Sequence, residues 1–397
     1  MSASQRPKGS GSLRNRGTER APRWFAYHFV TVDGKRRQIS RGPFDRKKDA
    51  EAWLRAELQL AREGRPTIPH RQTVGDLLDE WLAVVSHRLA PSTLAEYQRI
   101  VEHRLRPQLG ATKLADLRPA HIARAFDALR QPGGNRRGKA SKGLSETTLM
   151  HTHAVLRTAL AWAVKQRMIS TNPAEDVDRP KRQRGEMLIW SAEELGKFLA
   201  HCQSDRLYPL IRLAAFTGMR RSELLGLVWT DVDLSRSTVS IRRTRTRIGY
   251  EMVDRATTKS AASARLVDLD AETVTVLADW RKAQAAEREL WGSAYEDTAH
   301  VFTREDGTPV HADHLAQRFE RLVKAAGVPA IRFHDLRHTH ASLLLAAGVP
   351  VLDVSRRIGH ASAAVTLTVY AHLVPGQGQR AASLFASVVD RSDRDAT

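Results

Sequence analysis

The chain has 397 residues, enough for two or three domains, and a formal net charge of +19, which favours a polyanionic partner, nucleic acid before membrane. No apolar run approaches the roughly 20 residues needed to span a bilayer, so no transmembrane helix is expected. The single cysteine, Cys202, excludes an intramolecular disulfide and a cysteine-based metal site, and we expect it as a buried thiol in a reducing cytoplasm.

The N-terminal part predicts a basic module. Residues 1–20 are polar and basic without the apolar segment of a secretory signal, and we expect a disordered arm. Residues 24–41 alternate as strands around Asp33-Gly34, and a helix follows from about Asp45. A solvated hairpin and a DNA-binding domain over 21–65 both remain open. The DNA-binding candidates are Lys35, Arg36, Arg37, Arg41, Lys47 and Lys48.

Four helical patterns follow a linker at 66–71 and predict a compact helical domain over 71–170. Thr73 is expected to cap the first helix, and Ser92 or Thr93 the second. The third pattern holds Ile122, Phe126 and Leu129 on one face, and the fourth runs from Ser145 to about Arg167.

A loop rich in glycine, lysine and arginine, 131–143, joins the third and fourth helices. Its near match to a phosphate-binding loop is rejected, because no strand precedes it and Ala140 lacks the hydroxyl that would hold magnesium. A loop lying on DNA phosphates through Arg136, Arg137 and Lys139 and a plain surface loop remain open.

A second linker, Asn172-Pro173 with the charged run 178–186, precedes the third domain. Ser191 with Glu194 forms a capping box at its start. We expect this domain over 187–389 and a tail over 390–397.

Three segments of the third domain supply a set of side chains suited to phosphodiester chemistry. Attack on a phosphodiester adds charge to the nonbridging oxygens, and the planar forks of Arg220 and Arg337 suit them. Tyr370 offers a phenol as nucleophile, but its pKa near 10 requires positive charge and a proton acceptor nearby. The leaving sugar oxygen needs a proton donor, and Lys259 on a predicted hairpin could supply it.

These residues could also have other roles, in the core or at a metal site. A tyrosine beside an apolar helix is usually a core residue. His334 and His338 are spaced to share a zinc ion, but the glutamate of the metalloprotease helix motif is absent and Arg337 would repel a cation. We therefore predict no metal and no cofactor.

These residues resemble those of a known family, the phage-type integrases among the tyrosine recombinases. The chain resembles it over about 190–385 in the order and spacing of five segments, and more weakly in its N-terminal organisation. The segments are Thr217-Gly218-Met219-Arg220 with Glu223-Leu224, Lys259 with Ser263 and Arg265, His334-Asp335-Leu336-Arg337-His338-Thr339, Gly359-His360, and Tyr370-Ala371-His372.

The resemblance implies roles for single residues. Tyr370 would be the nucleophile that forms a 3′-phosphotyrosine, and Arg220 and Arg337 would bind the scissile phosphate. Lys259 would be the general acid. His334 and His360 would assist proton transfer or phosphate binding, and Glu223 would support the site structurally.

The resemblance also implies a fold and partners. The fold would be α+β but mainly α, with a small β-sheet-plus-helix arm-binding module, a helical core-binding domain and a mostly helical catalytic domain containing a small antiparallel sheet. The partners would be double-stranded DNA at attachment sites, a homotetramer on that DNA, and a directionality factor with a host DNA-bending protein. The protein would act in the cytoplasm at the nucleoid. A C-terminal helix could pack in cis or on a neighbour.

Two alternatives differ in class from an integrase. A type IB topoisomerase shares the chemistry but relaxes DNA alone, and the basic N-terminal module argues against it. A DNA-binding regulator on the same fold would lack catalysis, and the complete set of catalytic residue types argues against that.

Overall fold

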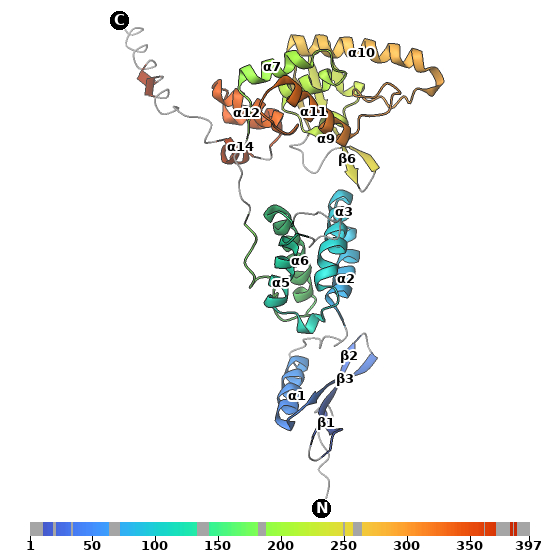
Figure 1. Ribbon diagram of the computed structural model, residues 1–397, viewed down its shortest axis with the longest axis vertical. Coiled ribbons are helices and arrows are strands. Elements are labelled where there is room, and N and C mark those ends of the chain that lie inside the picture. The colour runs from blue at the N-terminus through green and yellow to red at the C-terminus, as the bar shows by residue number, and fades with distance from the viewer. Residues whose placement is uncertain are drawn as a thin grey trace, which may run out of the picture. The chain divides into compact units, whose positions relative to one another are not determined.

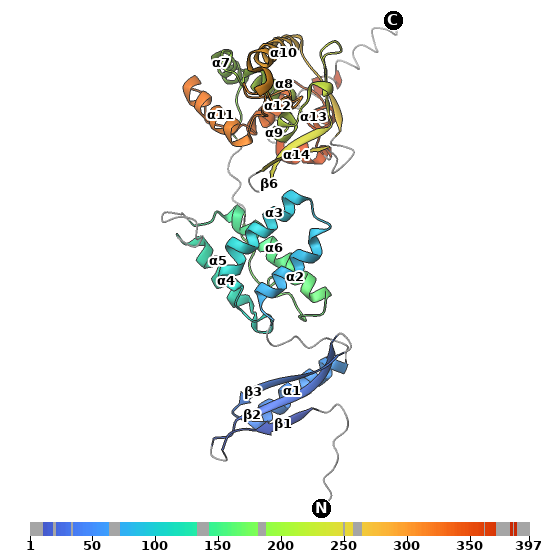
Figure 2. The same cartoon turned by 90° about the vertical axis from the view of Figure 1, so that its right-hand side faces the viewer.

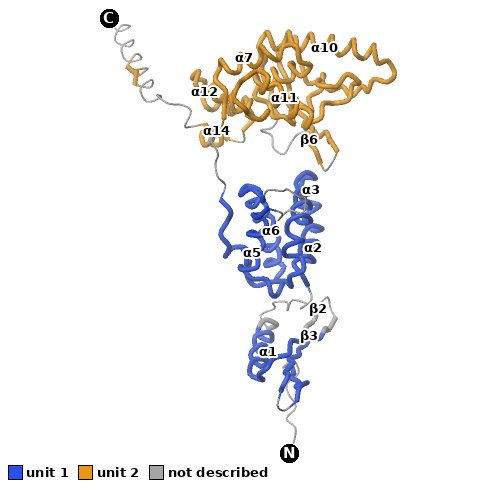
Figure 3. The backbone as a smooth tube through the Cα atoms, viewed as in Figure 1, with its two compact units in different colours: residues 1–185 blue, residues 186–397 orange. Residues whose placement is uncertain are grey.

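A computed structural model describes residues 11–18, 21–32, 35–62, 72–132, 143–181, 188–248, 251–256, 264–360, 362–370, 382–383 and 385–386. The chain divides into two compact units, residues 1–185 and 186–397 (Figure 3). Helices with small antiparallel sheets make up the described part, as the predicted mainly α class requires. No helix of the described residues is long and apolar enough to cross a membrane.

The first unit begins with a three-stranded antiparallel sheet, in the order β1 (Ser12–Asn15), β2 (Trp24–Val32) and β3 (Lys35–Phe44). Helix α1 (Lys47–Arg62) packs on this sheet (Figure 2) and buries Ala50 and Leu54, as its apolar periodicity predicts. The prediction of disorder through residue 20 is wrong for β1, because this strand pairs with β2 and Leu13 packs against the small core. A four-residue strand is too short to show a period in the sequence.

A helical bundle makes up the rest of the described first unit. Its core comes from the apolar faces of its helices, including Leu77, Trp81, Phe126 and Leu156. Its elements are α2 (Val74–Ser86), α3 (Pro91–Ile100), a π-helical turn (Val101–Leu105), α4 (Arg106–Leu109), a 3₁₀ turn (Leu114–Asp116), α5 (Pro119–Arg130) and α6 (Glu146–Lys165).

One of the two caps predicted for this bundle is confirmed, since Thr73 caps α2 with a capping box. The fourth helical pattern was expected from Ser145, and this residue is the N-cap of α6. The cap predicted at Ser92 or Thr93 is wrong, because α3 already begins at Pro91 with Ala90 as its N-cap residue. Proline fixes φ at a helical value and needs no N–H partner in the first turn, so it starts the helix earlier.

The second unit is mostly helical (Figure 1) and carries two small antiparallel sheets. Ser191 and Glu194 form the predicted capping box at its first helix. Its helices are α7 (Ala192–Cys202), α8 (Tyr208–Thr217), α9 (Arg221–Leu225), α10 (Ala271–Trp291), α11 (Ala312–Ala326), α12 (Asp335–Ala346), α13 (Val351–Ile358) and α14 (Ala363–Tyr370), with 3₁₀ turns at Trp229–Asp231 and Gly292–Ala294.

Two antiparallel sheets accompany these helices. The first has the order β4 (Val232–Asp233), β5 (Thr238–Ile241) and β8 (Arg265–Asp268), and the second is the hairpin of β6 (Arg243–Ile248) and β7 (Glu251–Ala256). Alternate residues of β5 and β8, including Val239, Ile241 and Val267, enter the main core. Cys202 lies in that core as predicted, and burial raises the pKa of its thiol to about 12.

Candidate active site

The site begins at the turn between α8 and α9. Gly218 ends α8 with a φ of +64°, and a Cβ there would lie 2.9 Å from Cδ2 of His340, so the turn requires glycine. The chain then enters α9 with Arg220 as the N-cap residue. The backbone N–H of Arg220 donates to Oε2 of Glu223 at 2.9 Å, and its Nη1 donates to Oε1 at 2.8 Å. Glu223 thus holds both the backbone N–H and the guanidinium of Arg220.

Glu223 is a buried carboxylate between two arginines. Arg265 on β8 donates Nη1 to Oε1 at 3.1 Å and Nη2 to Oε2 at 2.9 Å. Burial by itself raises the pKa of Glu223, but the hydrogen bonds and charges of Arg265 and Arg220 outweigh it, and the pKa is lowered. The Glu223 carboxylate therefore stays charged and ties α9 to β8.

The end of α13 joins this network through two backbone carbonyls. Arg220 donates Nη2 to the carbonyl of Gly359 at 2.5 Å, and Arg265 donates Nε to the carbonyl of Arg357 at 2.8 Å. Gly359 has a φ of +70°, and a Cβ on it would lie 2.6 Å from Nη1 of Arg265. Only glycine therefore allows the α13 terminus to approach the arginines this closely.

Arg337, in the first turn of α12, is a buried cation, and one of its guanidinium nitrogens makes no hydrogen bond to the described residues. Its side chain donates Nη1 to the carbonyl of Gly218 at 2.7 Å, and its buried Nη2 has no hydrogen-bond partner among the described residues. Burial, with the charge of Arg220, lowers the pKa of Arg337 to about 9, so the group is still a cation at neutral pH. A buried, unpaired guanidinium N–H is costly, and an anionic oxygen would satisfy it.

Tyr370 lies at the end of α14 with its ring fully buried. The ring belongs to a small apolar cluster with Leu345, Val354 and Ile358, so the core interpretation of this tyrosine is correct for its ring. Its hydroxyl, however, is hydrogen-bonded to Nδ1 of His338 at 2.6 Å. Burial raises the pKa of Tyr370 to about 12, with partial opposition from the charge of Arg337.

His334 and His360 lie close to the same group. The His360 ring stacks on Tyr370, with 6.5 Å between the ring centroids, and its Nδ1 is hydrogen-bonded to Oγ1 of Thr366 at 2.8 Å. His334, at the N-cap position of α12, meets His338 edge-on with 5.3 Å between centroids. Burial first, and then the charges of the arginines, lower the pKa of His360 to about 4. His360 is therefore neutral at neutral pH.

The structure brings Arg220, Arg337, His360 and Tyr370 together in the second unit, with Glu223 beneath Arg220. Lys259 lies outside the described residues. Hairpin β6–β7, which ends just before 257–263, is held to α11 by Arg247, whose Nη1 donates to Asp313 at 2.6 Å. Among the described residues, no group of three or more histidine, cysteine, aspartate or glutamate side chains could hold a metal ion.

The predicted DNA-binding residues are only partly described. Arg41, Lys47 and Lys48 are exposed on β3 and α1, and Lys47 lies 3.7 Å from Glu51. For Lys35, Arg36 and Arg37 the structure describes only the backbone, which lies in β3. The loop residues Arg136, Arg137 and Lys139 lie outside the described residues.

The sequence assigned no role to two residues that the structure brings into the site, Arg265 and His338. Arg265 was part of a motif, but its pairing with Glu223 joins residues 42 positions apart, which no local period reveals. His338 follows His334 by one helical turn, and this spacing was the available signal that both would lie on one face of α12.

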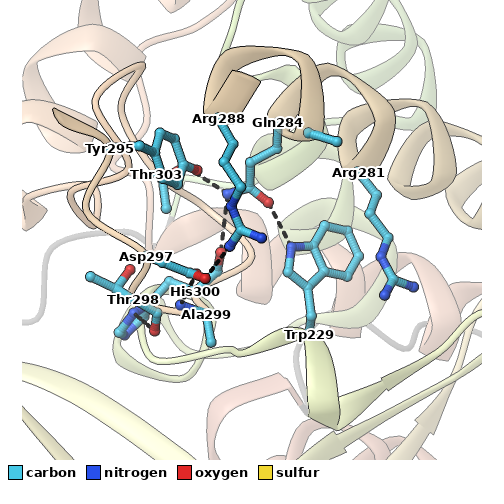
Figure 4. A pocket seen from close by; sticks show the side chains of 11 residues that line it. Trp229, Arg281, Gln284, Arg288, Tyr295, Asp297, Thr298, Ala299, His300 and Thr303 are labelled. Atoms are coloured by element: carbon cyan, nitrogen blue, oxygen red, sulfur yellow. Dashed lines mark hydrogen bonds and ion pairs between the residues drawn. The ribbon is translucent and has the colours of Figure 1, made fainter. Parts of the chain in front are cut away.

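A separate pocket of about 290 Å³ lies beside α10 and the segment 295–303 (Figure 4). Gln284 accepts a hydrogen bond from Nε1 of Trp229 at 2.6 Å, and Arg288 forms an ion pair with Asp297 and lies over the ring of Tyr295. Because these polar groups already contact one another, we interpret them as structural contacts and assign no ligand to this pocket.

Two family descriptions match the chain. The phage integrase family matches residues 190–376, and the N-terminal SAM-like domain of phage integrases matches residues 73–129. A XerC-like tyrosine recombinase of Caldanaerobacter subterraneus is 29% identical over 351 residues, covering 83% of this chain and 87% of the relative. An integrase of Streptomyces ambofaciens is 28% identical over 384 residues, covering 93% of each chain.

Solved structures show the same fold. The Tn1549 transposon integrase bound to circular intermediate DNA superposes with a TM-score of 0.62 at 20% identity, covering 75% of this chain and 95% of that one. A lambda integrase tetramer bound to a Holliday junction has a TM-score of 0.55 at 17% identity, covering 92% and 96%. The family matches and the XerC-like relative identify the chain as a tyrosine recombinase, and the solved structures share its fold. The chain belongs to the phage integrase family, and it is an enzyme, a site-specific recombinase.

Proposed function

We propose that this recombinase integrates the DNA of a phage or another mobile element into a chromosome, through a 3′-phosphotyrosine on Tyr370. The observation that carries the proposal is the buried Nη2 of Arg337, which has no partner among the described residues. Glu223 holds Arg220 nearby at the start of α9, so two guanidinium groups could bind one phosphate. The charge of +19 supports DNA as the substrate.

The proposed catalytic residues divide phosphate binding and proton transfer among them. Arg220 and Arg337 bind the nonbridging oxygens of the scissile phosphate, and Glu223 holds Arg220 in place. Lys259 gives a proton to the leaving 5′ oxygen, and His334 and His360 assist with phosphate binding or proton transfer. Nε2 of His360 is suited to this, because its Nδ1 is already engaged with Thr366.

The reaction conserves the energy of the phosphodiester. The Tyr370 oxygen bonds to phosphorus while the bond to the 5′ oxygen breaks, and the 5′-hydroxyl of another strand later reverses this step. Two rounds of exchange through a four-way junction yield recombinants without a nucleotide. The arginines supply the charge neutralisation that a metal ion would otherwise give, so we expect no metal requirement.

The proposed partners follow from relatives and from charge. The protein would act as a homotetramer on double-stranded attachment sites, and the lambda integrase tetramer on a Holliday junction supports this by its shared fold. A directionality factor and a host DNA-bending protein would set direction and bring sites together. Exposed Arg41, Lys47 and Lys48 support a DNA-binding role for the N-terminal module. The protein would act in the cytoplasm, at the nucleoid.

The deciding experiment is covalent trapping on a nicked suicide duplex. Its sequence is taken from the attachment-site DNA that flanks the gene encoding this protein. The protein should form an adduct in excess EDTA without ATP, and Tyr370→Phe should bind the duplex normally yet form none, because only the phenolic oxygen is lost. An adduct formed by Tyr370→Phe would refute the nucleophile. A protein that forms no adduct would be a regulator, and one that relaxes DNA without joining two sites would be a topoisomerase.

A further inference from the structure

The nucleophile must lose a proton before or while it attacks. A phenol is a weak nucleophile at neutral pH, and burial raises the pKa of Tyr370 further. The proton therefore needs an acceptor within hydrogen-bond reach of the Tyr370 oxygen. Neither Lys259, proposed to give a proton, nor the two arginines, which stay protonated, can take that role.

One described side chain touches the phenolic oxygen. Nδ1 of His338 lies 2.6 Å from Oη of Tyr370, within the range of a short hydrogen bond. His338 follows Arg337 directly near the start of α12, so the backbone that places the phosphate-binding cation also places this ring. His360 approaches Tyr370 by ring stacking, and its Nδ1 is engaged by Thr366.

The geometry points to His338 as the general base that takes the phenolic proton of Tyr370, a role that rests on the proposed recombinase chemistry at this tyrosine. In the forward step the proton moves from Oη to Nδ1 of His338, the phenolic oxygen bonds to phosphorus, and the 5′ oxygen leaves with a proton from Lys259. In the rejoining step the 5′-hydroxyl gives its proton back to the deprotonated Lys259 and attacks phosphorus, the bond from phosphorus to the phenolic oxygen breaks, and His338 returns its proton to that oxygen.

The surroundings of His338 keep it neutral and ready to accept. Burial, the largest cause, and the charges of Arg337 and Arg332 lower the pKa of His338, while Asp335 on the same helix acts in the opposite direction. His334, at the start of the same helix, meets the His338 ring edge-on, and Tyr370 of α14 is hydrogen-bonded to it. His360, which follows α13, lies close enough for the charge of His338 to affect the pKa of His360. At neutral pH the ring is therefore uncharged. In the tautomer with its hydrogen on Nε2, Nδ1 accepts the hydrogen bond from the Tyr370 hydroxyl.

The test compares His338→Asn and His338→Ala with the unaltered chain in single-turnover cleavage of the nicked suicide duplex. The asparagine oxygen can accept the phenolic hydrogen bond from nearly the position of Nδ1, but it is not basic. We expect both variants to bind the duplex and to cleave about 100-fold or more slowly, the usual contribution of a general base. His314→Asn, on an exposed histidine of α11, is the matched control and should cleave normally.

A second readout separates proton transfer from a structural role. Difluorotyrosine at position 370 has a more acidic phenol, so in the His338→Asn background it should restore at least tenfold of the lost rate. The unaltered chain should also lose activity as pH falls and His338 becomes protonated, and His338→Asn should lack that acidic limb.

Three results would overturn the inference. These are cleavage by His338→Asn within about threefold of the unaltered chain, a slow variant that difluorotyrosine does not rescue, and faster cleavage by His338→Ala, which would make the hydrogen bond a restraint on Tyr370. Failure of the proposed function is distinguishable, because then the unaltered chain would form no adduct at all.

Discussion

Replacing Glu223 with glutamine changes one atom of the side chain and removes the charge that joins α9 to β8. In the unaltered chain the two carboxylate oxygens accept four hydrogen bonds, from the Arg220 N–H, Arg220 Nη1, and Nη1 and Nη2 of Arg265. A glutamine amide has only one accepting oxygen, so its NH₂ group must face donors that it cannot satisfy.

The magnitude follows from burial. The Glu223 side chain is 2% exposed and that of Arg265 is 8% exposed, so water cannot replace the lost contacts. Removing one partner of a buried ion pair costs about 3–5 kcal/mol, because the other charge remains without compensation. For a unit of this size, each kcal/mol lowers the melting temperature by about 2–4 °C, so we expect a fall of roughly 10 °C.

The assay is thermal unfolding of the full chain at neutral pH, with suicide-duplex cleavage measured well below the melting temperature. Glu320→Gln, on an exposed position of α11, removes the same charge and should leave both measurements unchanged. Cleavage by Glu223→Gln should fall as well, since Arg220 loses its support. A melting temperature within about 2 °C of the unaltered chain would refute the reasoning.

The same argument gives a pH dependence with a definite sign. The pKa of Glu223 is lowered in the folded state, so its contribution to stability is fully present above the ordinary glutamate pKa of about 4.3. It is lost as pH falls through the lower folded pKa. The stability difference between Glu223→Gln and the unaltered chain should therefore shrink in acid, and a difference that grows there would contradict the ion-pair account.

The remaining predictions concern the turn, the general acid and the N-terminal module. Gly359→Ala should destabilise the chain by at least about 1–2 kcal/mol in thermal unfolding, because of its φ of +70° and the approach of Arg265, whereas Gly196→Ala, with open space around it on α7, should be neutral or stabilising. Lys259→Ala should regain much of its lost cleavage on DNA with sulfur at the 5′-bridging position, because a thiolate leaves without a proton, and Arg337→Ala should regain far less; rescue of neither would make Lys259 a phosphate-binding or structural residue. A chain that starts near Arg71 should still cleave a core site but lose integration, and equal integration efficiency would show that the first module does not bind arm sites.

The sequence by itself determined the local structure and the inventory of the site. Apolar periodicity and capping residues predicted α1, α2, α5, α6 and α7, because a helix repeats every 3.6 residues and each end must satisfy its own backbone groups. The site inventory of two arginines, histidines and a tyrosine could be read from residue types and spacing. Strand β1 and the start of α3 at Pro91 were missed, because their signals are weaker than a period over several turns.

Only the tertiary structure decided which groups touch. Arg337 bonds the carbonyl of Gly218 across 119 positions, Arg265 reaches Glu223 across 42, and His338 reaches Tyr370 across 32. No local pattern encodes such contacts, since they depend on how α12, α14 and β8 pack against α13. The sequence could therefore supply a nucleophile and the cations, but folding chose the partner of the phenol, because a hydrogen bond requires two atoms within about 3 Å.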